Sequence, residues 1–274
     1  MTAIETFRRL HDSGCFVLPN PWDAGTARYL HHLGFAALAT TSAGIAFARG
    51  LPDEVGAVSL DATLAHVREV VAATPLPVTA DFQSGFAREL EELAANVTAC
   101  VRTGAAGLSI EDATGDPDAP LLPRATAIDR LRAARAAIDA TGVPVVLTAR
   151  CEAWLVRDPD AAATAIDRLV AFADAGADCL YAPGVRDPAT IATIVAAVAP
   201  RPVNVLVSAP GPGLSVRRLA DLGVRRISVG SALARVAWAA FQRAARSLAE
   251  TDAFEGLAGA TPIAELNQLF ATRA

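Results

Sequence analysis

The chain has 274 residues, of which 53% are apolar, and a net charge of −5 at neutral pH. This length and composition suit one large folded domain, and the acidic balance argues against a nucleic-acid partner, which would need a basic surface. All 24 basic residues are arginine, so Schiff-base aldolases, pyridoxal-phosphate enzymes and Walker-type phosphate loops are excluded, since each needs a lysine amine.

Short apolar runs alternate with Ala-rich helical patterns along the whole chain. The runs are apolar rather than alternating, which is typical of parallel strands covered on both faces, and they predict strands at 15–20, 35–41, 77–82, 106–112, 143–150, 178–184, 202–207 and 225–230. Helical patterns lie between them, for example at 60–74, 89–104, 126–142 and 160–176. We therefore predict an α/β fold, a closed (β/α)8 TIM barrel. An open doubly wound sheet is the alternative, disfavoured because no GxGxxG follows the first strand.

A long helix is predicted at 231–250, after the last strand, and a shorter helical segment at 261–270. Residues 1–274 would thus form a single barrel domain with a C-terminal helical extension, which either caps the barrel or packs against a second copy. No run of about 18 apolar residues lacks a charge or proline, and the first residues lack a secretory pattern. We expect no membrane association and a cytoplasmic location.

Cysteine, histidine and serine give no sign of thiol, zinc or triad chemistry. No CxxC pair occurs, so the cysteines are interpreted as buried apolar residues: Cys15, Cys100, Cys151 and Cys179. The histidines precede the third predicted strand and end none, so they are interpreted as surface or packing residues: His11, His31, His32 and His66. Ser208 and Ser231 have no histidine partner for a catalytic triad.

Polar side chains end three consecutive predicted strands. Asp81 ends the third, Glu111 the fourth and Arg150 the fifth, with Glu152 just beyond. Catalytic groups of a parallel barrel gather at this end, and neighbouring carboxylates repel unless a cation joins them. Mg²⁺ prefers such oxygen ligands, and an arginine can hold a carboxylate or an enolate-like oxyanion beside it. The alternative is that the carboxylates only cap helices or pair with arginine.

Two Gly/Pro-containing segments, 209–213 and 229–231, could bind an anion through backbone N–H groups, although plain turns are the favoured interpretation.

Several segments, in this order and spacing, resemble the isocitrate lyase/phosphoenolpyruvate mutase superfamily, in its 2-methylisocitrate lyase and phosphonomutase-like branch. The segments that carry the resemblance are NPWDAGTARYLHHLGFAALATTSAG (20–44), GLPD (50–53), TADFQSGF (79–86), GAAGLSIED (104–112), TARCEAWL (148–155) and DAGADCLY (174–181). The resemblance covers about residues 16–231. It implies a Mg²⁺-dependent barrel that cleaves C–C bonds of 2-oxo or 2-hydroxy acids, or rearranges or hydrolyses P–C bonds, through enolate-like species.

The resemblance also implies roles for particular residues. The metal ligands, direct or through water, would be Asp81, Glu111, Asp53 and Gln83, with Mg²⁺ or Mn²⁺ as the ion. Thr41, Ser42 and Ala43 would hold the substrate carboxylate through backbone N–H groups, and Trp22 and Asp23, just after the first strand, are further substrate-binding candidates. Arg150 and Glu152 are the catalytic candidates. The last barrel helix, 231–250, would swap between subunits of a homodimer or homotetramer.

Two departures from the family pattern bear on the reaction. Gln83 stands where the family has a second acid, which removes one negative charge from the metal site. The segment 113–124 contains no cysteine, lysine or histidine, so neither the lyases' thiol acid nor the mutases' lysine is present there. We predict a Mg²⁺-dependent lyase, by C–C cleavage or decarboxylation, of a small carboxylate. Phosphonopyruvate-type P–C chemistry and a non-catalytic carboxylate-binding barrel are the alternatives.

Overall fold

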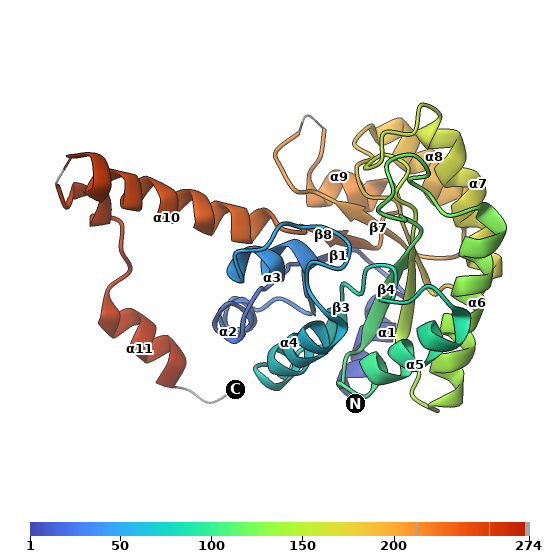
Figure 1. The fold of residues 1–274 in the computed structure, drawn as a ribbon, viewed down its shortest axis with the longest axis horizontal. Coiled ribbons are helices and arrows are strands. Elements are labelled where there is room, and N and C mark those ends of the chain that lie inside the picture. Colours follow the sequence, from blue (N-terminus) through green and yellow to red (C-terminus); the bar gives the residue numbers. More distant parts are fainter. Residues whose placement is uncertain (212, 252, 272–274) are drawn as a thin grey trace.

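The computed structural model describes residues 1–211, 213–251 and 253–271. Within these residues, eight parallel strands form one sheet in the order β1-β8-β7-β6-β5-β4-β3-β2 (Figure 1). The strands are β1 (Phe16–Leu18), β2 (Leu38–Ala39), β3 (Val78–Ala80), β4 (Gly107–Glu111), β5 (Val146–Arg150), β6 (Cys179–Tyr181), β7 (Val203–Leu206) and β8 (Arg226–Ser228).

The sheet closes almost completely into a barrel. β1 pairs with β8 over three residues, and the seam between β1 and β2 is bridged by the Ala39 N–H, which donates to the carbonyl of Pro19 at 3.1 Å. The predicted (β/α)8 barrel is thus confirmed, and the open doubly wound sheet is excluded. Every predicted strand is present but shorter than predicted, because the ladder ends where each chain segment turns into its loop.

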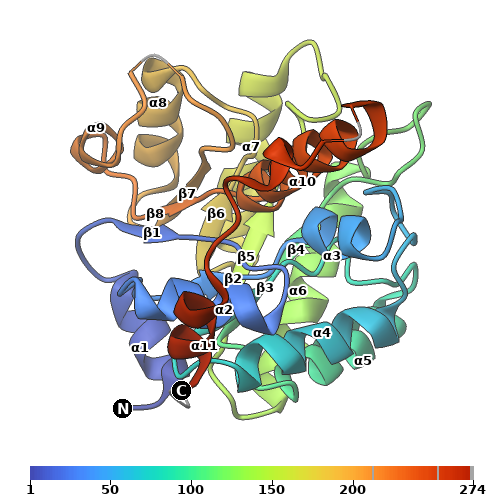
Figure 2. The same cartoon turned by 90° about the vertical axis from the view of Figure 1, so that its left-hand side faces the viewer.

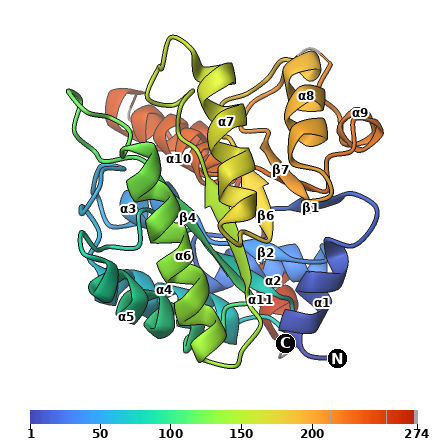
Figure 3. The ribbon, with the colours of Figure 1, turned by 90° about the vertical axis from the view of Figure 1, so that its right-hand side faces the viewer.

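Helices cover the outside of the barrel between successive strands (Figure 3). They are α2 (Ala24–His32), α3 (Ser42–Ala48), α4 (Leu60–Ala72), α5 (Leu90–Val101), α6 (Arg124–Ala140), α7 (Ala161–Asp174), α8 (Pro188–Val198) and α9 (Val216–Asp221). Gly104, Gly142 and Gly176 follow α5, α6 and α7 with φ of 87°, 70° and 101°, the left-handed conformation that ends a helix. Cys100, Cys151 and Cys179 are buried, as predicted, whereas Cys15 is only half-buried.

The first helix, α1 (Ala3–Leu10), closes the N-terminal end of the barrel. Its N-cap Thr2 forms a capping box with Glu5, which fixes where the helix starts. Phe7 is fully buried and clusters with barrel residues such as Leu18 and Cys179. Because this end is filled, a ligand enters the barrel only from the carboxyl ends of the strands.

The C-terminal helices leave the barrel. α10 (Ala232–Thr251) projects away from it, and after a short 3-10 turn, η1 (Glu255–Leu257), α11 (Ile263–Ala271) comes back against α2 (Figures 1 and 2). Arg28 of α2 donates to the Phe270 carbonyl of α11 at 2.9 Å. In the described part of the chain, no helix has the length and apolar character needed to cross a bilayer.

Candidate active site

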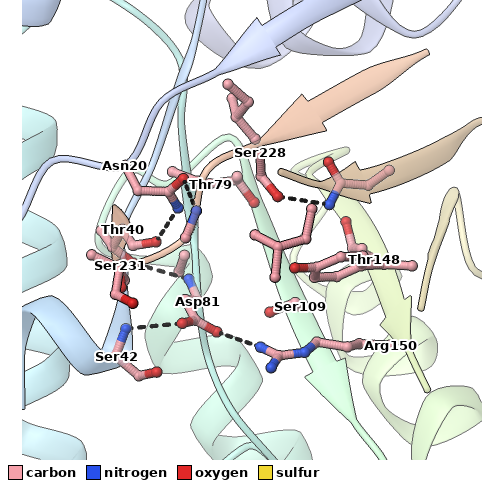
Figure 4. A pocket seen from close by; sticks show the side chains of 18 of the residues that line it. Asn20, Thr40, Ser42, Thr79, Asp81, Ser109, Thr148, Arg150, Ser228 and Ser231 are labelled. Carbon is pink, nitrogen blue, oxygen red and sulfur yellow. Dashed lines mark hydrogen bonds and ion pairs between the residues drawn. The ribbon is translucent and has the colours of Figure 1, made fainter. Parts of the chain in front are cut away.

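A cavity of about 180 Å³ opens at the carboxyl ends of the strands (Figure 4). Most of the residues that line it have polar side chains, and they come from strands all round the barrel. The predicted site residues that line it are Thr41, Ser42, Ala43, Asp53, Asp81 and Arg150. The structure therefore brings together most of the residues that the strand-end argument and the family resemblance singled out.

Arg150 is the centre of a cluster of carboxylates. Its guanidinium lies 3.2 Å from Asp81 and 3.0 Å from Glu111, and it forms a two-point ion pair with Glu152. Its side chain is only 16% exposed, and the ring of Tyr181 lies 5.4 Å away. The side chains of Asp81, Glu111 and Arg150 therefore meet, as their positions at three consecutive strand ends predict.

The cluster holds more negative charge than Arg150 neutralises. Burial, and then the charges of Glu152, Asp81 and Asp53, raise the pKa of Glu111 to about 8 against the lowering effect of Arg150. Burial alone would lower the pKa of Arg150, but the surrounding carboxylates raise it well above its usual value. Arg150 therefore stays charged, and the remaining carboxylates favour either a proton on Glu111 or a further cation.

A small hollow beside the main cavity has polar side chains in one part of its wall and apolar side chains in the rest. Asp53, Asp81, Ser42 and Gln83 are among the residues that line this space of about 10 Å³, close to what one water fills. Burial, followed by the charge of Asp81, raises the pKa of Asp53. Among the described residues, no three His, Cys, Asp or Glu side chains are placed to hold an ion directly. The donor set fits an ion that keeps most of its waters and takes one or two carboxylates, which is the habit of Mg²⁺.

Two side chains from the outer helices hold the loop that carries Gln83. Asn96 donates to the carbonyls of Gly85 and Phe86, and Arg130 donates to the carbonyls of Ser84, Ala87 and Arg88. A Cβ at Gly85 would lie 2.2 Å from Leu93, and φ there is +78°. Only glycine fits this turn, which keeps Gln83 (φ 47°) next to Asp81.

The first turn of α3 forms one wall of the cavity. Thr41 caps the helix by accepting from the Gly44 N–H, and the Ser42 N–H donates to Asp81 at 2.8 Å. The Ser42 amide is therefore already used by a carboxylate of the protein, which differs from the predicted role of holding the substrate carboxylate. Ala43 lines the same wall.

Five predicted site residues do not line the cavity. Glu111 contacts Arg150 but is not itself part of the wall, and Gln83 lines only the small hollow. Trp22 lies in a separate shallow groove with Trp238 and Phe241 of α10. Asp23 caps α2, accepting from the N–H and hydroxyl of Thr26, because a carboxylate before a helix satisfies its free amides. Glu152 is buried behind Arg150, so it positions the guanidinium and does not face the ligand space.

The segment 229–231, for which a plain turn is favoured over an anion site, uses its backbone N–H groups within the protein. The N–H groups of Val229 and Gly230 donate to the side-chain oxygen of Asn20, at 3.1 and 2.9 Å. They are therefore occupied, which agrees with the turn interpretation. The other such segment, 209–213, contains position 212, which lies outside the described residues.

Sequence reasoning missed a further set of polar side chains inside the barrel. These cavity residues are Thr79, Ser109, Thr148, Tyr181, Asn204, Arg226 and Ser228, of which Tyr181 lies beside Arg150. Their spacing in the sequence could have indicated three of them. Thr79, Ser109 and Thr148 each stand two residues before a predicted site residue, and side chains two apart on a strand point to the same face.

The fold and this cavity define a (β/α)8 barrel with its polar site at the usual catalytic end. Residues 7–249 match the family described as phosphoenolpyruvate phosphomutase. The chain belongs to this family, within the isocitrate lyase/phosphoenolpyruvate mutase superfamily.

Individual relatives add detail. A Burkholderia cenocepacia J2315 structure described only as a lyase/mutase is 47% identical, covering 98% of this chain and 96% of that one, with a TM-score of 0.94. An oxaloacetate acetylhydrolase in complex with its product oxalate is 26% identical, with coverages of 98% and 93% and a TM-score of 0.87. The 2-methylisocitrate lyase of Salmonella typhimurium LT2 is 34% identical over 58% of this chain and 54% of that enzyme.

Proposed function

We propose that the protein is a Mg²⁺-dependent carbon–carbon lyase or decarboxylase of a small 2-oxo or 2-hydroxy carboxylate. The observation that carries the proposal is the cluster in which Asp81 and Glu111 meet the Arg150 guanidinium at the cavity wall. Relatives named for lyase and hydrolase reactions on small acids support the same class.

Arg150 would bind and orient the ligand. Its planar guanidinium matches a carboxylate or an enolate oxygen, and the ion pair with Glu152 fixes its direction. When the C–C bond of the substrate breaks, its electron pair moves into the neighbouring carbonyl or carboxylate group of one fragment and forms an enolate, whose oxygen is stabilised by the permanent charge of Arg150. The enolate carbon then takes up a proton, from water or from the substrate hydroxyl that becomes a carbonyl. Bound Mg²⁺, held by Asp81 and through water by Asp53, Glu111 and Gln83, would supply Lewis-acid chemistry.

Tyr181 is a candidate hydrogen-bond donor to the ligand in the cavity. It lines the cavity beside Arg150, and burial raises its pKa to about 12, so its hydroxyl stays protonated at neutral pH. A protonated hydroxyl there can donate a hydrogen bond to the ligand oxyanion. This offers a donor in a chain whose loop 113–124 carries no thiol, amine or imidazole.

Metal dependence of turnover tests the proposal. The purified protein is incubated with oxaloacetate, 2-methylisocitrate and 2,3-dimethylmalate, and the formation of pyruvate or other oxo-acid products is measured with Mg²⁺ or Mn²⁺ and after EDTA. We expect turnover of at least one acid, abolished by EDTA, restored by metal, and lowered about a hundredfold or more in Asp81→Asn. Asp61→Asn, at an exposed position on α4, is the control and should keep full activity. Intact metal binding without turnover of any acid contradicts the proposal.

Phosphonopyruvate chemistry is the second candidate, favoured by the description of the family that matches residues 7–249. Conversion of phosphonopyruvate to phosphoenolpyruvate, or release of phosphate from it, with no cleavage of the carboxylic acids, would select this reaction. Binding of oxalate that is independent of Mg²⁺ and unchanged by Glu111→Gln, without any turnover, would indicate a non-catalytic barrel.

A further inference from the structure

Arg226 is a buried arginine inside the barrel, below the Arg150 cluster. It is 3% exposed and lines the cavity. Its Nε donates to the Asn204 side-chain oxygen at 3.0 Å, and one terminal nitrogen donates to the Thr148 hydroxyl at 3.0 Å. The other terminal nitrogen lies 3.3 Å from His11 Nε2.

None of these partners carries a negative charge. Asn204 and Thr148 are neutral, and burial, followed by the charge of Arg226, lowers the pKa of His11 to about 3. His11 is therefore neutral, with Nδ1 donating to the Phe7 carbonyl at 2.8 Å and Nε2 accepting from Arg226. Among the described residues, no carboxylate lies within 4 Å of Arg226.

Arg226 differs in this respect from Arg150 and Arg168, which each pair with at least one carboxylate at about 3 Å. Arg130 is also buried without a carboxylate partner, but it donates to three backbone carbonyls and does not line this cavity, whereas Arg226 does line it. A buried charge without a counter-ion is unfavourable, and an anion in the cavity would offset this cost at Arg226. Of the five N–H groups of a guanidinium, the described contacts use three, which leaves one on each terminal nitrogen.

The cavity connects Arg226 with the upper cluster. Thr148, which accepts from Arg226, stands two residues before Arg150 on β5, and both side chains line the cavity. Because they are two residues apart, Thr148 and Arg150 stand about 7 Å apart along β5, and Arg226 lies at the level of Thr148. A short carbon chain with an anionic group at each end spans such a separation.

We propose that Arg226 is a second anion-binding residue, which takes the far carboxylate of a dicarboxylic substrate while Arg150 faces its 2-oxo or 2-hydroxy end. The proposal rests on the proposed function only in taking such an acid as the ligand. Thr148, Asn204 and His11 hold the guanidinium in place, and specificity for diacids over monoacids follows from Arg226.

The experiment compares two ligands that share one end. Calorimetry with the Mg²⁺-loaded protein measures the affinities of pyruvate, a 2-oxo monoacid, and of 3,3-difluorooxaloacetate, which adds a second carboxylate. In Arg226→Gln, the affinity for the diacid should fall about ten- to a hundredfold, while the affinity for pyruvate changes less than about threefold. Arg226→Lys, which keeps the charge, should restore part of the lost diacid affinity. The matched control is Arg225→Gln, because Arg225 is the neighbouring residue and bonds to the Gly14 carbonyl instead.

The outcomes separate the two proposals. An equal change for both ligands in Arg226→Gln, or no change for either, overturns the role of Arg226 and leaves the lyase proposal standing. A selective loss of diacid affinity with no C–C cleavage supports Arg226 and contradicts the lyase. If Arg226→Gln does not fold, a crystal structure of the unaltered protein with difluorooxaloacetate decides. The second carboxylate lies within about 3 Å of the Arg226 terminal nitrogens, or else the proposal is wrong.

Discussion

At the scale of single residues, the function depends on where an arginine lies more than on how it is paired. Arg150 and Arg135 are similarly buried, with side chains 16% and 19% exposed, and both form ion pairs with more than one carboxylate. Arg135 pairs with Asp178 and Asp139 on the outside of the barrel, whereas Arg150 lines the cavity. Substitutions of Arg135 and Arg150 can therefore distinguish an effect on stability from an effect on catalysis.

We predict that Arg150→Lys lowers kcat/KM by about a hundredfold or more, because an ammonium cannot make the two-point contact of a guanidinium. The rates are measured on the acid that the unaltered enzyme turns over best. Arg135→Lys should lower the melting temperature about as much as Arg150→Lys does. It should leave kcat/KM within about threefold of the value for the unaltered enzyme. Equal activity losses in the two variants would show that Arg150 acts only through folding.

The site could be predicted from sequence only at the strand ends. Asp81, Glu111 and Arg150 stand out because a charge that ends an apolar run has an evident place at the barrel mouth. Arg226 lies within its strand, so the run alone does not show whether it points into the barrel or toward the helices. Asp23 resembled a site residue because a carboxylate after a strand serves equally well as the cap of the next helix.

At the scale of elements, the loop between β4 and α6 is held by contacts within the loop and by an ion pair at its base. Ala113 and Leu121 form an antiparallel bridge within it, and the Thr114 N–H donates to the Pro120 carbonyl at 3.0 Å. At its base, Asp112 is buried, accepts from the Glu152 N–H at 2.8 Å and pairs with Arg168 of α7 at 3.0 Å. Asp112 thus connects the ends of β4 and β5 with α7, next to the cluster.

A double-mutant cycle tests that connection. Arg168→Met leaves the Asp112 carboxylate buried without its cation, so the free energy of unfolding in urea should fall by about 3–5 kcal/mol. Adding Asp112→Asn should recover a substantial part of the loss, because the uncompensated charge is then gone. The comparison is Arg124→Met, which breaks the exposed pair with Asp167 and should cost about 1 kcal/mol or less. Losses that simply add in the double variant would contradict coupling.

Elements with a strong apolar pattern were predictable, and short ones were not. All eight strands and the helices α4 to α7 lie where their patterns indicate, and Gly104, Gly142 and Gly176 mark three helix ends. The patterns gave no sign of α3, which is only seven residues long and is fixed by its Thr41 cap and by the Ser42–Asp81 contact. Such a helix depends on tertiary contacts that no local pattern contains.

At the scale of the whole molecule, the C-terminal extension exposes a large apolar surface. Along α10, Val236 is 67% exposed, Phe241 61% and Trp238 38%, and beyond it Phe254 and Ile263 are 74% and 78% exposed. α10 projects from the barrel, so the barrel does not cover these side chains (Figure 1). Exposed apolar side chains along a helix that projects from its domain are typical of an interface, and we propose that α10 packs against a second copy of the chain.

The oligomer prediction is tested on the exposed aromatic residues of α10. The unaltered protein should have the mass of a homodimer or homotetramer in light scattering coupled to size exclusion, and Phe241→Glu should shift that mass toward the monomer. A charge there would have to be desolvated at the interface, at a cost of several kcal/mol, whereas on a free helix it is harmless. Val216→Glu, at a site on α9 that is 50% exposed, places the same charge on the barrel surface and should leave the mass unchanged. A monomeric unaltered protein, or a Phe241→Glu variant that keeps the oligomer mass, would contradict an interface through α10.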